Sequence, residues 1–181
     1  MIVLKDIICI HMIKVFVPTR KDYEKIVALV NEADLVFLDI YTTKEAREVG
    51  VGELSKEDLI SGEKTRNYFA LKDKTKLIAF ASFRLKNSQT VWISSFYVKV
   101  GYQGKGYGAV LLSAVEDFTV KNKARVVVLE TEKKAKWAVN FYLKNGYKKL
   151  SVRNLAKFPF DKVIDKKPVS NRYIMGKVVE T

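Results

Sequence analysis

The chain has few of the residues that bind metals or form disulfides. Its 181 residues include one cysteine, Cys9, and one histidine, His11. An internal disulfide needs two cysteines, and a structural zinc site draws its ligands mainly from cysteine and histidine. The sequence therefore excludes both within these residues, and we expect no metal. We expect His11 to be a strand or surface residue. Cys9 is not expected to act as a nucleophile, because no base or cation accompanies it.

Long apolar segments are also absent. No run of about 18 apolar residues occurs, so a membrane-spanning helix is not expected. The apolar start Ile2–Leu4 is broken by Lys5 and Asp6, too early for the core of a signal peptide. These features predict a cytoplasmic protein with no membrane partner.

Acidic residues are fewer than basic residues. The chain has 33 Lys and Arg against 20 Asp and Glu, a formal net charge of +13. Such a charge attracts anions, including phosphate-bearing cofactors, acidic peptides and nucleic acid. The lysines are scattered, as in Lys72–Lys74 and Lys162–Lys167, which is typical of a solvated surface. No zinc-finger or RNA-binding aromatic motif occurs, so we do not expect nucleic acid as a partner.

The spacing of apolar residues predicts an α/β (α+β) chain with one domain. Apolar residues make up 48% of the chain, near the globular average. Short polar connections predict antiparallel neighbours among the earlier strands. Residues 34–52 are predicted as a loop or irregular helix, and 153–170 as a basic connection. Strands are predicted at 13–17, 68–71, 77–85, 91–98, 126–129, 147–152 and 173–179, and helices after residue 22 and at 56–61, 105–121 and 134–144.

Two helix starts carry the capping pattern of a hydroxyl residue followed three positions later by an acid. These are Thr19 with Asp22, and Ser55 with Asp58. We expect each pair to cap the helix that follows it.

A glycine-rich loop connects the predicted strand 91–98 to the next helix. Glycines alternate at Gly104, Gly106 and Gly108. Without side-chain bulk, backbone N–H groups approach an anion closely, and at a helix N-terminus these groups are unpaired and the helix dipole is positive. The loop therefore predicts a phosphate or pyrophosphate site, with a ligand-free turn as the alternative.

A dinucleotide-binding fingerprint is a second alternative, because Gly104–Ala109 also matches G-x-G-x-x-A and Glu130 follows a later strand. Three features oppose it. Residues 99–103 separate the loop from its strand, the loop follows an antiparallel meander, and one further clear helix is too few for a doubly wound sheet. A P-loop is excluded because no Gly-Lys-Ser/Thr follows at the required spacing.

The sequence resembles the GCN5-related N-acetyltransferase (GNAT) superfamily in three segments. Val98–Gly108 resembles V-x-P-x-Y-[R/Q]-G-x-G-x-[G/A], and Ala138–Tyr147 resembles A-x-x-[F/L]-Y-x-x-x-G-[F/Y]. Arg172–Lys177 resembles the family's final strand. The resemblance covers residues 13–179, nearly the whole chain. We therefore expect a GNAT-like domain over 13–181 and an N-terminal extension over 1–12, with Met12 as a possible alternative start.

The resemblance implies a fold and a cofactor. The fold is a mixed, mostly antiparallel sheet flanked by helices and splayed between its fourth and fifth strands, here 91–98 and 126–131. The implied cofactor is acetyl-CoA, bound in that gap. Its pantetheine arm would pair with the backbone of Phe96 and Val98, and its pyrophosphate would contact the loop Gln103, Gly104, Lys105, Gly106, Tyr107 and Gly108.

Two positions match catalytic residues of the family. Tyr142 matches the acid that protonates the departing thiolate, and a phenol with a pKa near 10 stays protonated at neutral pH. The strand 91–98 lacks the glutamate of many members. Glu130, twelve residues before Tyr142, resembles the base of the branch that acetylates protein N-terminal amines. Glu132 on the same strand face, or water near Ser94 and Ser95, are alternative bases.

Two positions depart from the family pattern. Val100 replaces a proline, and Ala135 stands where an asparagine usually contacts the cofactor. The expected function is acetyl transfer from acetyl-CoA to a primary amine of a protein N-terminus, a lysine or a small molecule. The net charge favours a neutral or acidic acceptor over a polycation.

The alternative to an enzyme is a CoA-binding sensor or basic adaptor that kept the fold and lost its catalytic activity.

Overall fold

The computed structural model describes residues 13–151, 153 and 171–179. The expectations for Cys9, His11, the extension 1–12 and most of the connection 153–170 lie outside these residues. The described elements are β1 (Ile13–Phe16), α1 (Tyr23–Asp34), the 3-10 helix η1 (Leu35–Asp39), α2 (Thr43–Val49), α3 (Lys56–Gly62), β2 (Asn67–Asp73), β3 (Lys76–Asn87), β4 (Thr90–Val98), α4 (Tyr107–Lys121), β5 (Val126–Glu132), α5 (Lys136–Lys144), β6 (Lys148–Leu150) and β7 (Arg172–Val178).

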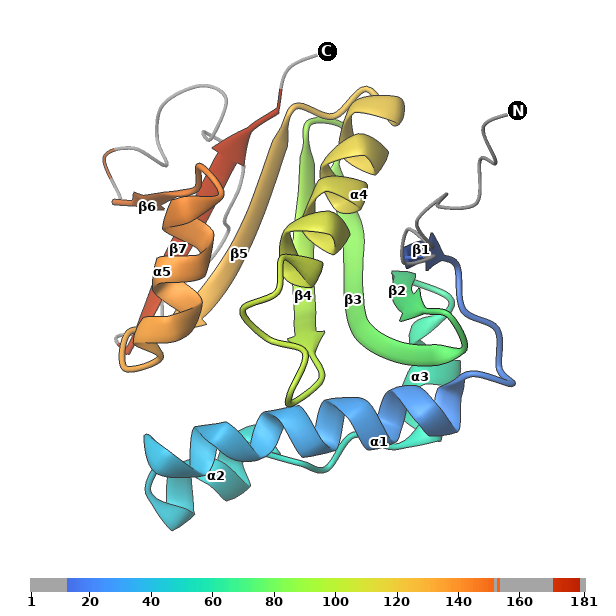
Figure 1. Ribbon diagram of the computed structural model, residues 1–181. Helices are drawn as coiled ribbons and strands as arrows, with labels where there is room; N and C mark the ends of the chain where they lie inside the picture. The colour runs from blue at the N-terminus through green and yellow to red at the C-terminus, as the bar shows by residue number, and fades with distance from the viewer. Residues whose placement is uncertain (1–12, 152, 154–170, 180–181) are drawn as a thin grey trace, which may run out of the picture.

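The strands form one sheet in the order β1-β2-β3-β4-β5-β7-β6 (Figure 1). Among the described strands, only β4 and β5 pair in parallel, and all other neighbours are antiparallel. The predicted mixed, mostly antiparallel sheet is confirmed. The sheet is not the doubly wound parallel sheet that a dinucleotide fingerprint requires.

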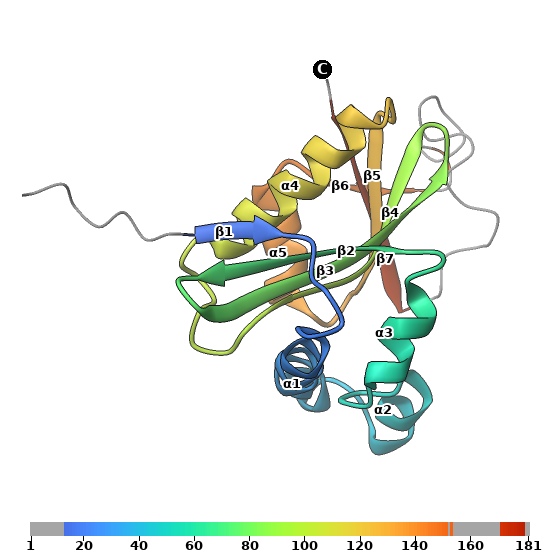
Figure 2. The same cartoon turned by 90° about the vertical axis from the view of Figure 1, so that its right-hand side faces the viewer.

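Helices cover both faces of this sheet. Figure 2 shows α1 and α3 on one face and α4 and α5 on the other. The apolar stripe of α1, including Ile26 and Val30, packs with Leu59 of α3 against Tyr68 and Phe80 of the sheet. A larger core lies between the sheet and α4 and α5. Of the helices in the described part of the chain, none combines the length and apolarity needed to span a bilayer.

Local sequence explains some helix boundaries and not others. Ser55 and Asp58 form the predicted capping box of α3. Only half of the capping box predicted for Thr19 and Asp22 forms. The Asp22 carboxylate accepts from the Thr19 amide at 2.8 Å, but the N-cap of α1 is Asp22 and not Thr19, and it makes no side-chain cap. Residues 34–52, predicted as a loop or irregular helix, contain α2, whose capping box is formed by Thr42 and Glu45.

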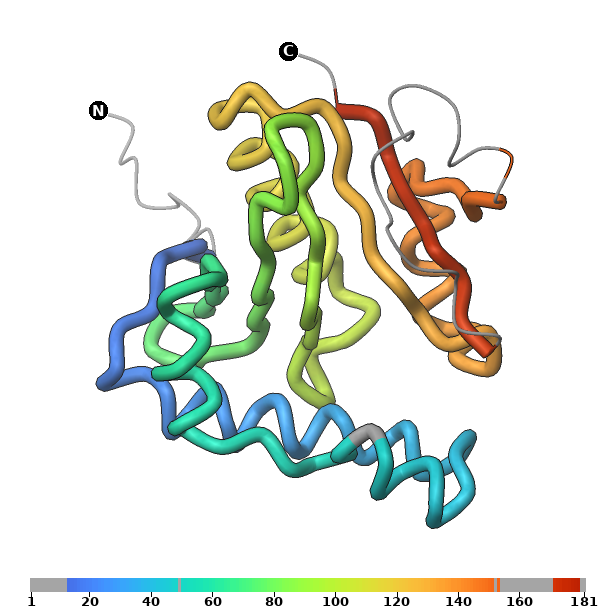
Figure 3. Tube along the Cα trace, turned by 180° about the vertical axis from the view of Figure 1, so that it is seen from behind, coloured from blue at the N-terminus to red at the C-terminus, as the bar shows by residue number. Residues whose placement is uncertain are grey.

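The sheet opens between β4 and β5. Their pairing covers only Thr90–Ile93 and Val126–Leu129. Beyond it, β4 stays with β3 as far as Val98, and β5 stays with β7 as far as Glu132. Figure 3 shows the two halves of the sheet diverging. The splay expected from the family resemblance is therefore present.

A β-bulge in β4 lies where the sheet opens. Ser94 has no partner in β3, because the register shifts between its two neighbours. Side chains alternate across a strand, so one extra residue exchanges the faces of those that follow. Ile93 and Phe96 consequently pack on the α4 face, whereas Tyr97 packs with α1.

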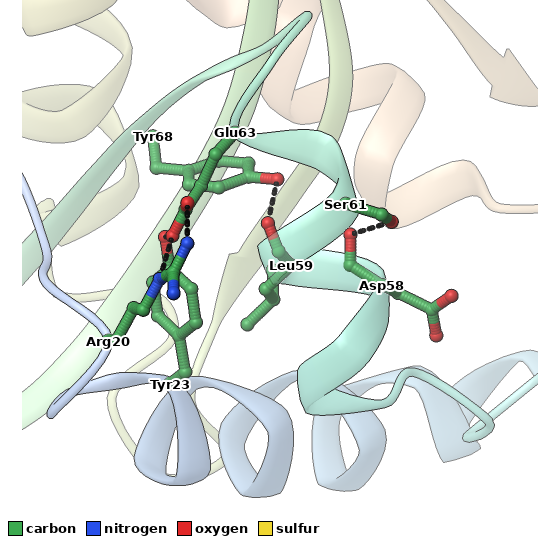
Figure 4. Close-up of polar contacts among 7 residues, drawn as sticks. All are labelled: Arg20, Tyr23, Asp58, Leu59, Ser61, Glu63 and Tyr68. Carbon is green, nitrogen blue, oxygen red and sulfur yellow. Dashed lines mark hydrogen bonds and ion pairs between the residues drawn. The ribbon is translucent and has the colours of Figure 1, made fainter.

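Polar contacts fix the end of α3 against the sheet and against the start of α1 (Figure 4). The Tyr68 hydroxyl donates to the Leu59 carbonyl at 2.9 Å. Arg20 donates to Glu63 through two nitrogens, at 3.0 and 2.7 Å, and Tyr23 donates to the same carboxylate at 2.9 Å. α3 ends at Gly62, where an added Cβ would lie 2.1 Å from the Tyr68 hydroxyl oxygen.

We expect Gly62→Ala to lower the free energy of unfolding by about 1–3 kcal/mol, because the methyl group displaces a buried, hydrogen-bonded tyrosine. Denaturant titration measures the change. Ser61→Ala on the exposed side of α3 is the control and should cost little. Tyr68→Phe, combined with Gly62→Ala, should recover much of the loss because the clashing oxygen is gone. A double variant no more stable than Gly62→Ala would contradict this account.

Candidate active site

A cavity of about 880 Å³ lies where β4 and β5 separate. Its wall combines the end of β4, the glycine-rich loop, the end of β5, one side of α5 and the segment that follows α1. The volume lies in the range typical of small-molecule sites. The divergence of the two strands therefore creates a concave site large enough for a small molecule.

The glycine-rich loop places free backbone at one end of this cavity. Gly104 and Gly106 have φ angles of +74° and +85°, which side chains rarely adopt, and an added Cβ at either position would meet no atom within 4 Å. Gly106 is the N-cap of α4 and makes no side-chain cap. The first N–H groups of the helix therefore remain available to an anion.

The other loop residues have different surroundings. The Gln103 amide donates to the Val98 carbonyl at 3.1 Å, and the Lys105 ammonium donates to the Gly101 carbonyl at 2.9 Å. Tyr107 is buried in the core with α4. An added Cβ at Gly108 would lie 3.1 Å from the Phe141 ring, so this glycine allows α4 to approach α5. Of the eight residues predicted to bind the cofactor, Phe96, Val98, Gln103, Gly104, Gly106 and Gly108 line the cavity, and Lys105 and Tyr107 do not.

Tyr142 lines the cavity from α5. The residue is 7% exposed and packs against the rings of Phe96, Phe141 and Tyr147, with centroid distances of 6.2, 5.1 and 5.6 Å. Burial raises the pKa of Tyr142 well above its ordinary value, and this is the single cause of the shift. The phenol is therefore held protonated, with a hydroxyl that can donate into the cavity.

A charged cluster lies across the gap on β5 and β7. Arg172 contacts Glu132 through Nε at 2.5 Å and Glu130 through Nη1 at 3.6 Å. The Glu132 side chain is 6% exposed and that of Glu130 is 25% exposed. Burial, followed by a hydrogen bond to Glu132, raises the pKa of Tyr41 to about 12. Glu132 thus accepts hydrogen bonds from Arg172 and Tyr41, whereas Glu130 faces the cavity and its ion pair with Arg172 is longer.

Tyr142 and the two glutamates approach the gap from opposite faces of the sheet. Val127 and Leu129 pack in the same core as Tyr142, whereas Val126 and Val128 pack on the other face. Side chains alternate along β5, so Glu130 and Glu132 share the face of Val126 and Val128. The cavity that they share with Tyr142 therefore passes through the opening in the sheet.

The segment after α1 closes the glutamate side. The Lys134 ammonium, after β5, donates to the Ile40 carbonyl at 3.1 Å. The rings of Phe37 and Trp137 lie 5.9 Å apart. These contacts join the β1–β4 half to the β5–β7 half across the gap.

Sequence reasoning missed several residues of this site. Asp34, Tyr41 and Trp137 line the cavity, and none belongs to a recognisable motif. Arg172 also lines it and lies in the segment that resembles the family's final strand, but the sequence assigned it no role. Ser94 and Ser95, named as possible water-binding residues, also line it. Among the described residues, no three histidine, cysteine or carboxylate side chains gather as a metal site would require.

A mixed sheet that opens beside a glycine-rich strand-to-helix loop is the architecture of acyl-CoA-dependent N-acyltransferases. The sequence profile of the acetyltransferase (GNAT) family matches residues 26–147, two thirds of the chain, and the chain belongs to this family. No curated protein sequence matches it.

Solved structures of this class share the fold at low sequence identity. PaiA N-acetyltransferase from Thermoplasma acidophilum, solved with coenzyme A, has a TM-score of 0.73 and 18% identity, covering 92% of this chain and 98% of that one. The ribosomal-protein-S18-alanine N-acetyltransferase of Escherichia coli has a TM-score of 0.66 and 16% identity, with 94% and 96% covered. Ard1 from Thermoplasma volcanium has a TM-score of 0.67 and 16% identity, with 93% and 99% covered.

We expect Arg172→Gln to lower the free energy of unfolding by about 3 kcal/mol, because it leaves the buried Glu132 charge without its cation. Chemical denaturation measures the loss. Lys44→Gln breaks an exposed pair with Glu48 and should cost less than about 0.5 kcal/mol. Glu132→Gln added to Arg172→Gln should restore part of the loss by removing the buried charge. Equal costs for the Arg172 and Lys44 variants would contradict the buried pairing.

Proposed function

We propose that this protein transfers an acetyl group from acetyl-CoA to a primary amine by direct attack within a ternary complex. The supporting observation is one cavity that runs through the sheet, with a protonated phenol, Tyr142, on one face and a partly exposed carboxylate, Glu130, on the other. A thioester and an amine that meet in the gap would have an acid and a base on opposite sides.

The loop and the edge of β4 fit the shape of coenzyme A. Gly104 and Gly106 leave open space in front of backbone N–H groups at the start of α4, which suits a pyrophosphate. Past Ile93 the edge of β4 no longer pairs with β5, and its peptide groups can bind the amides of the pantetheine arm. The structural neighbour from Thermoplasma acidophilum contains coenzyme A, which agrees with this assignment.

Bound acetyl-CoA supplies the activated thioester carbonyl. Attack by the amine would form a carbon–nitrogen bond and break the carbon–sulfur bond. Glu130 would accept the proton that the nitrogen loses, and Tyr142 would donate its hydroxyl proton to the departing sulfur. No residue of the chain needs to form a covalent acyl intermediate.

Glu130 suits the base better than the alternatives. Glu132 is nearly buried and is occupied by Arg172 and Tyr41, so its oxygens are less available to an acceptor. Ser94 and Ser95 line the cavity and can hold water, but neither is a base by itself. Arg172 orients both glutamates and acts as a positioning residue.

One observation favours the second candidate, a CoA-binding protein with little turnover. Ala135 occupies the N-cap of α5, is fully buried and makes no side-chain cap, and a methyl group cannot make the polar contact that an asparagine makes there. A cofactor contact expected there is missing. Release of free thiol from acetyl-CoA in the presence of a panel of amines separates the two candidates.

We expect Gly106→Asp to weaken coenzyme A binding at least about tenfold relative to Gly106→Asn, because its carboxylate faces the pyrophosphate at the start of α4. Asparagine has the same shape, and both residues tolerate positive φ better than most. The comparison therefore isolates the charge. Isothermal titration calorimetry with CoA measures both. Equal affinities for the two variants would remove the loop from the cofactor site.

We expect Tyr142→Phe to lower kcat by about 10²–10⁴-fold when loss of sulfur limits the rate, with acetyl-CoA affinity nearly unchanged. Only a hydroxyl is lost, and the ring still packs against its aromatic neighbours. Single-turnover rates measure the chemical step. An unchanged single-turnover rate would refute the acid role.

Glu130→Gln provides the contrast because it acts on a different proton. Its defect should be largest at low pH and should shrink as pH rises, since more of the free amine then arrives neutral. A pH–rate profile for each variant tests this separation. A wild-type profile for Glu130→Gln would transfer the base role to Glu132 or to water near Ser94 and Ser95.

A further inference from the structure

A second cavity, of about 350 Å³, lies on the α1 face of the sheet. It is separate from the coenzyme A loop. α1, α3 and the segment before α3 form its sides, and the centre of the sheet forms its floor. Three carboxylates, one arginine and three aromatic rings contribute to its lining.

A buried hydroxyl without a partner lies on the floor of this cavity. Ser82 is 2% exposed, and its Oγ makes no hydrogen bond within the described structure. Burying a hydroxyl without a hydrogen bond is costly, and most buried polar atoms are satisfied. An unsatisfied hydroxyl in the lining of a cavity offers a hydrogen-bond partner to a polar ligand there.

The charged side chains that line this cavity favour a cationic ligand. Asp34, Glu53 and Asp58 line the cavity against one cation, Arg66. Hydrogen bonds from Ser55 hold the pKa of Asp58 below its ordinary value, so this carboxylate is charged at neutral pH.

The floor of the cavity adds aromatic rings to the carboxylates. Tyr68, Phe80 and Tyr97 line it from β2, β3 and β4. Aromatic faces attract ammonium groups, especially where water is partly excluded. Carboxylates, aromatic rings and a free hydroxyl together form a site for an ammonium group.

The second cavity adjoins the active-site cavity. Asp34, Ser95 and Tyr97 line both. At this shared wall the Tyr97 hydroxyl donates to Asp34 at 3.0 Å. The bulge at Ser94 places Ser95 and Tyr97 on this face of the sheet. A molecule with an amine beside Glu130 can therefore extend towards the α1 side.

We propose that the second cavity binds a second ammonium group of the acceptor, so that the acceptor is a short diamine rather than a simple monoamine. This inference rests on the proposed acetyltransferase function. It opposes the expectation from the net charge of +13, because the two cavities together are lined by five carboxylates and three cations. The local field at the acceptor is set by those side chains and not by distant lysines.

The test compares 1,4-diaminobutane with butylamine, which has the same carbon chain and one amine fewer. Steady-state acetylation by the full chain gives a KM for each. We expect the KM of the diamine to be at least about tenfold lower, since a hydrogen-bonded charge contributes that much to affinity.

Variants locate the effect in the cavity. Glu53 is exposed, and we expect Glu53→Gln to raise the KM of the diamine about fivefold, with the KM of butylamine unchanged. Ser82→Ala should raise the KM of the diamine about tenfold. It should not lower the melting temperature, because the hydroxyl that it removes has no hydrogen bond in the protein. Glu57→Gln on α3 removes the same charge outside both cavities and is the control. A purely structural Ser82 would change melting temperature alone.

The outcomes separate the two proposals. Acetylation of both amines with equal KM, or a diamine preference that survives Glu53→Gln and Ser82→Ala, overturns the second site and leaves the acetyltransferase function intact. Acetylation of neither amine counts against the proposed function. In that case, calorimetry of 1,4-diaminobutane with the CoA-loaded protein decides the site. Binding weakened by both variants supports it, and no binding overturns it.

Discussion

The architecture depends on the early end of the pairing between β4 and β5. Four residue pairs hold the two halves of the sheet together before the strands separate. Separation leaves peptide groups on two strand edges without partners, and in a folded protein such groups must be satisfied by a ligand or by water. The contacts of Lys134 and Phe37 across the gap limit how far the halves move apart. The same constraint thus creates the cavity and the need to fill it.

The sequence predicts those parts of the fold that depend on nearby residues. Alternating apolar residues give the strands, and the apolar run Val126–Leu129 gives a strand buried on both faces. The same capping pattern forms completely at Ser55 and only in part at Thr19, where α1 begins after Asp22. The bulge at Ser94 has no sequence marker, since it arises from the pairing of two strands and from the divergence beside them.

For the site, Tyr142 and Glu130 could be proposed because they match a family pattern and lie twelve residues apart. Arg172 could not, because it lies 40 residues from Glu132 in the chain and meets it only through the β5–β7 pairing. Asp34 reaches Tyr97 across 63 residues. Net charge says little about the charge of the site for a related reason. It counts lysines on the outer surface equally with the carboxylates around the cavity, although solvent screens the former strongly.

The position of β7 between β5 and β6 affects how the protein is made. β5 leaves the ribosome some 40 residues before β7, and its hydrophobic edge has no partner on that side until β7 arrives. Chains fold from the N-terminal end during synthesis, and exposed strand edges favour aggregation. Arg172 begins β7, so Glu130 and Glu132 also lack their shared cation until then. The half of the sheet that ends in β4 and the glycine-rich loop can form first, whereas the half that carries Glu130 and Glu132 is completed only when β7 pairs with β5, so a nascent chain would assemble the two walls of the cavity in sequence.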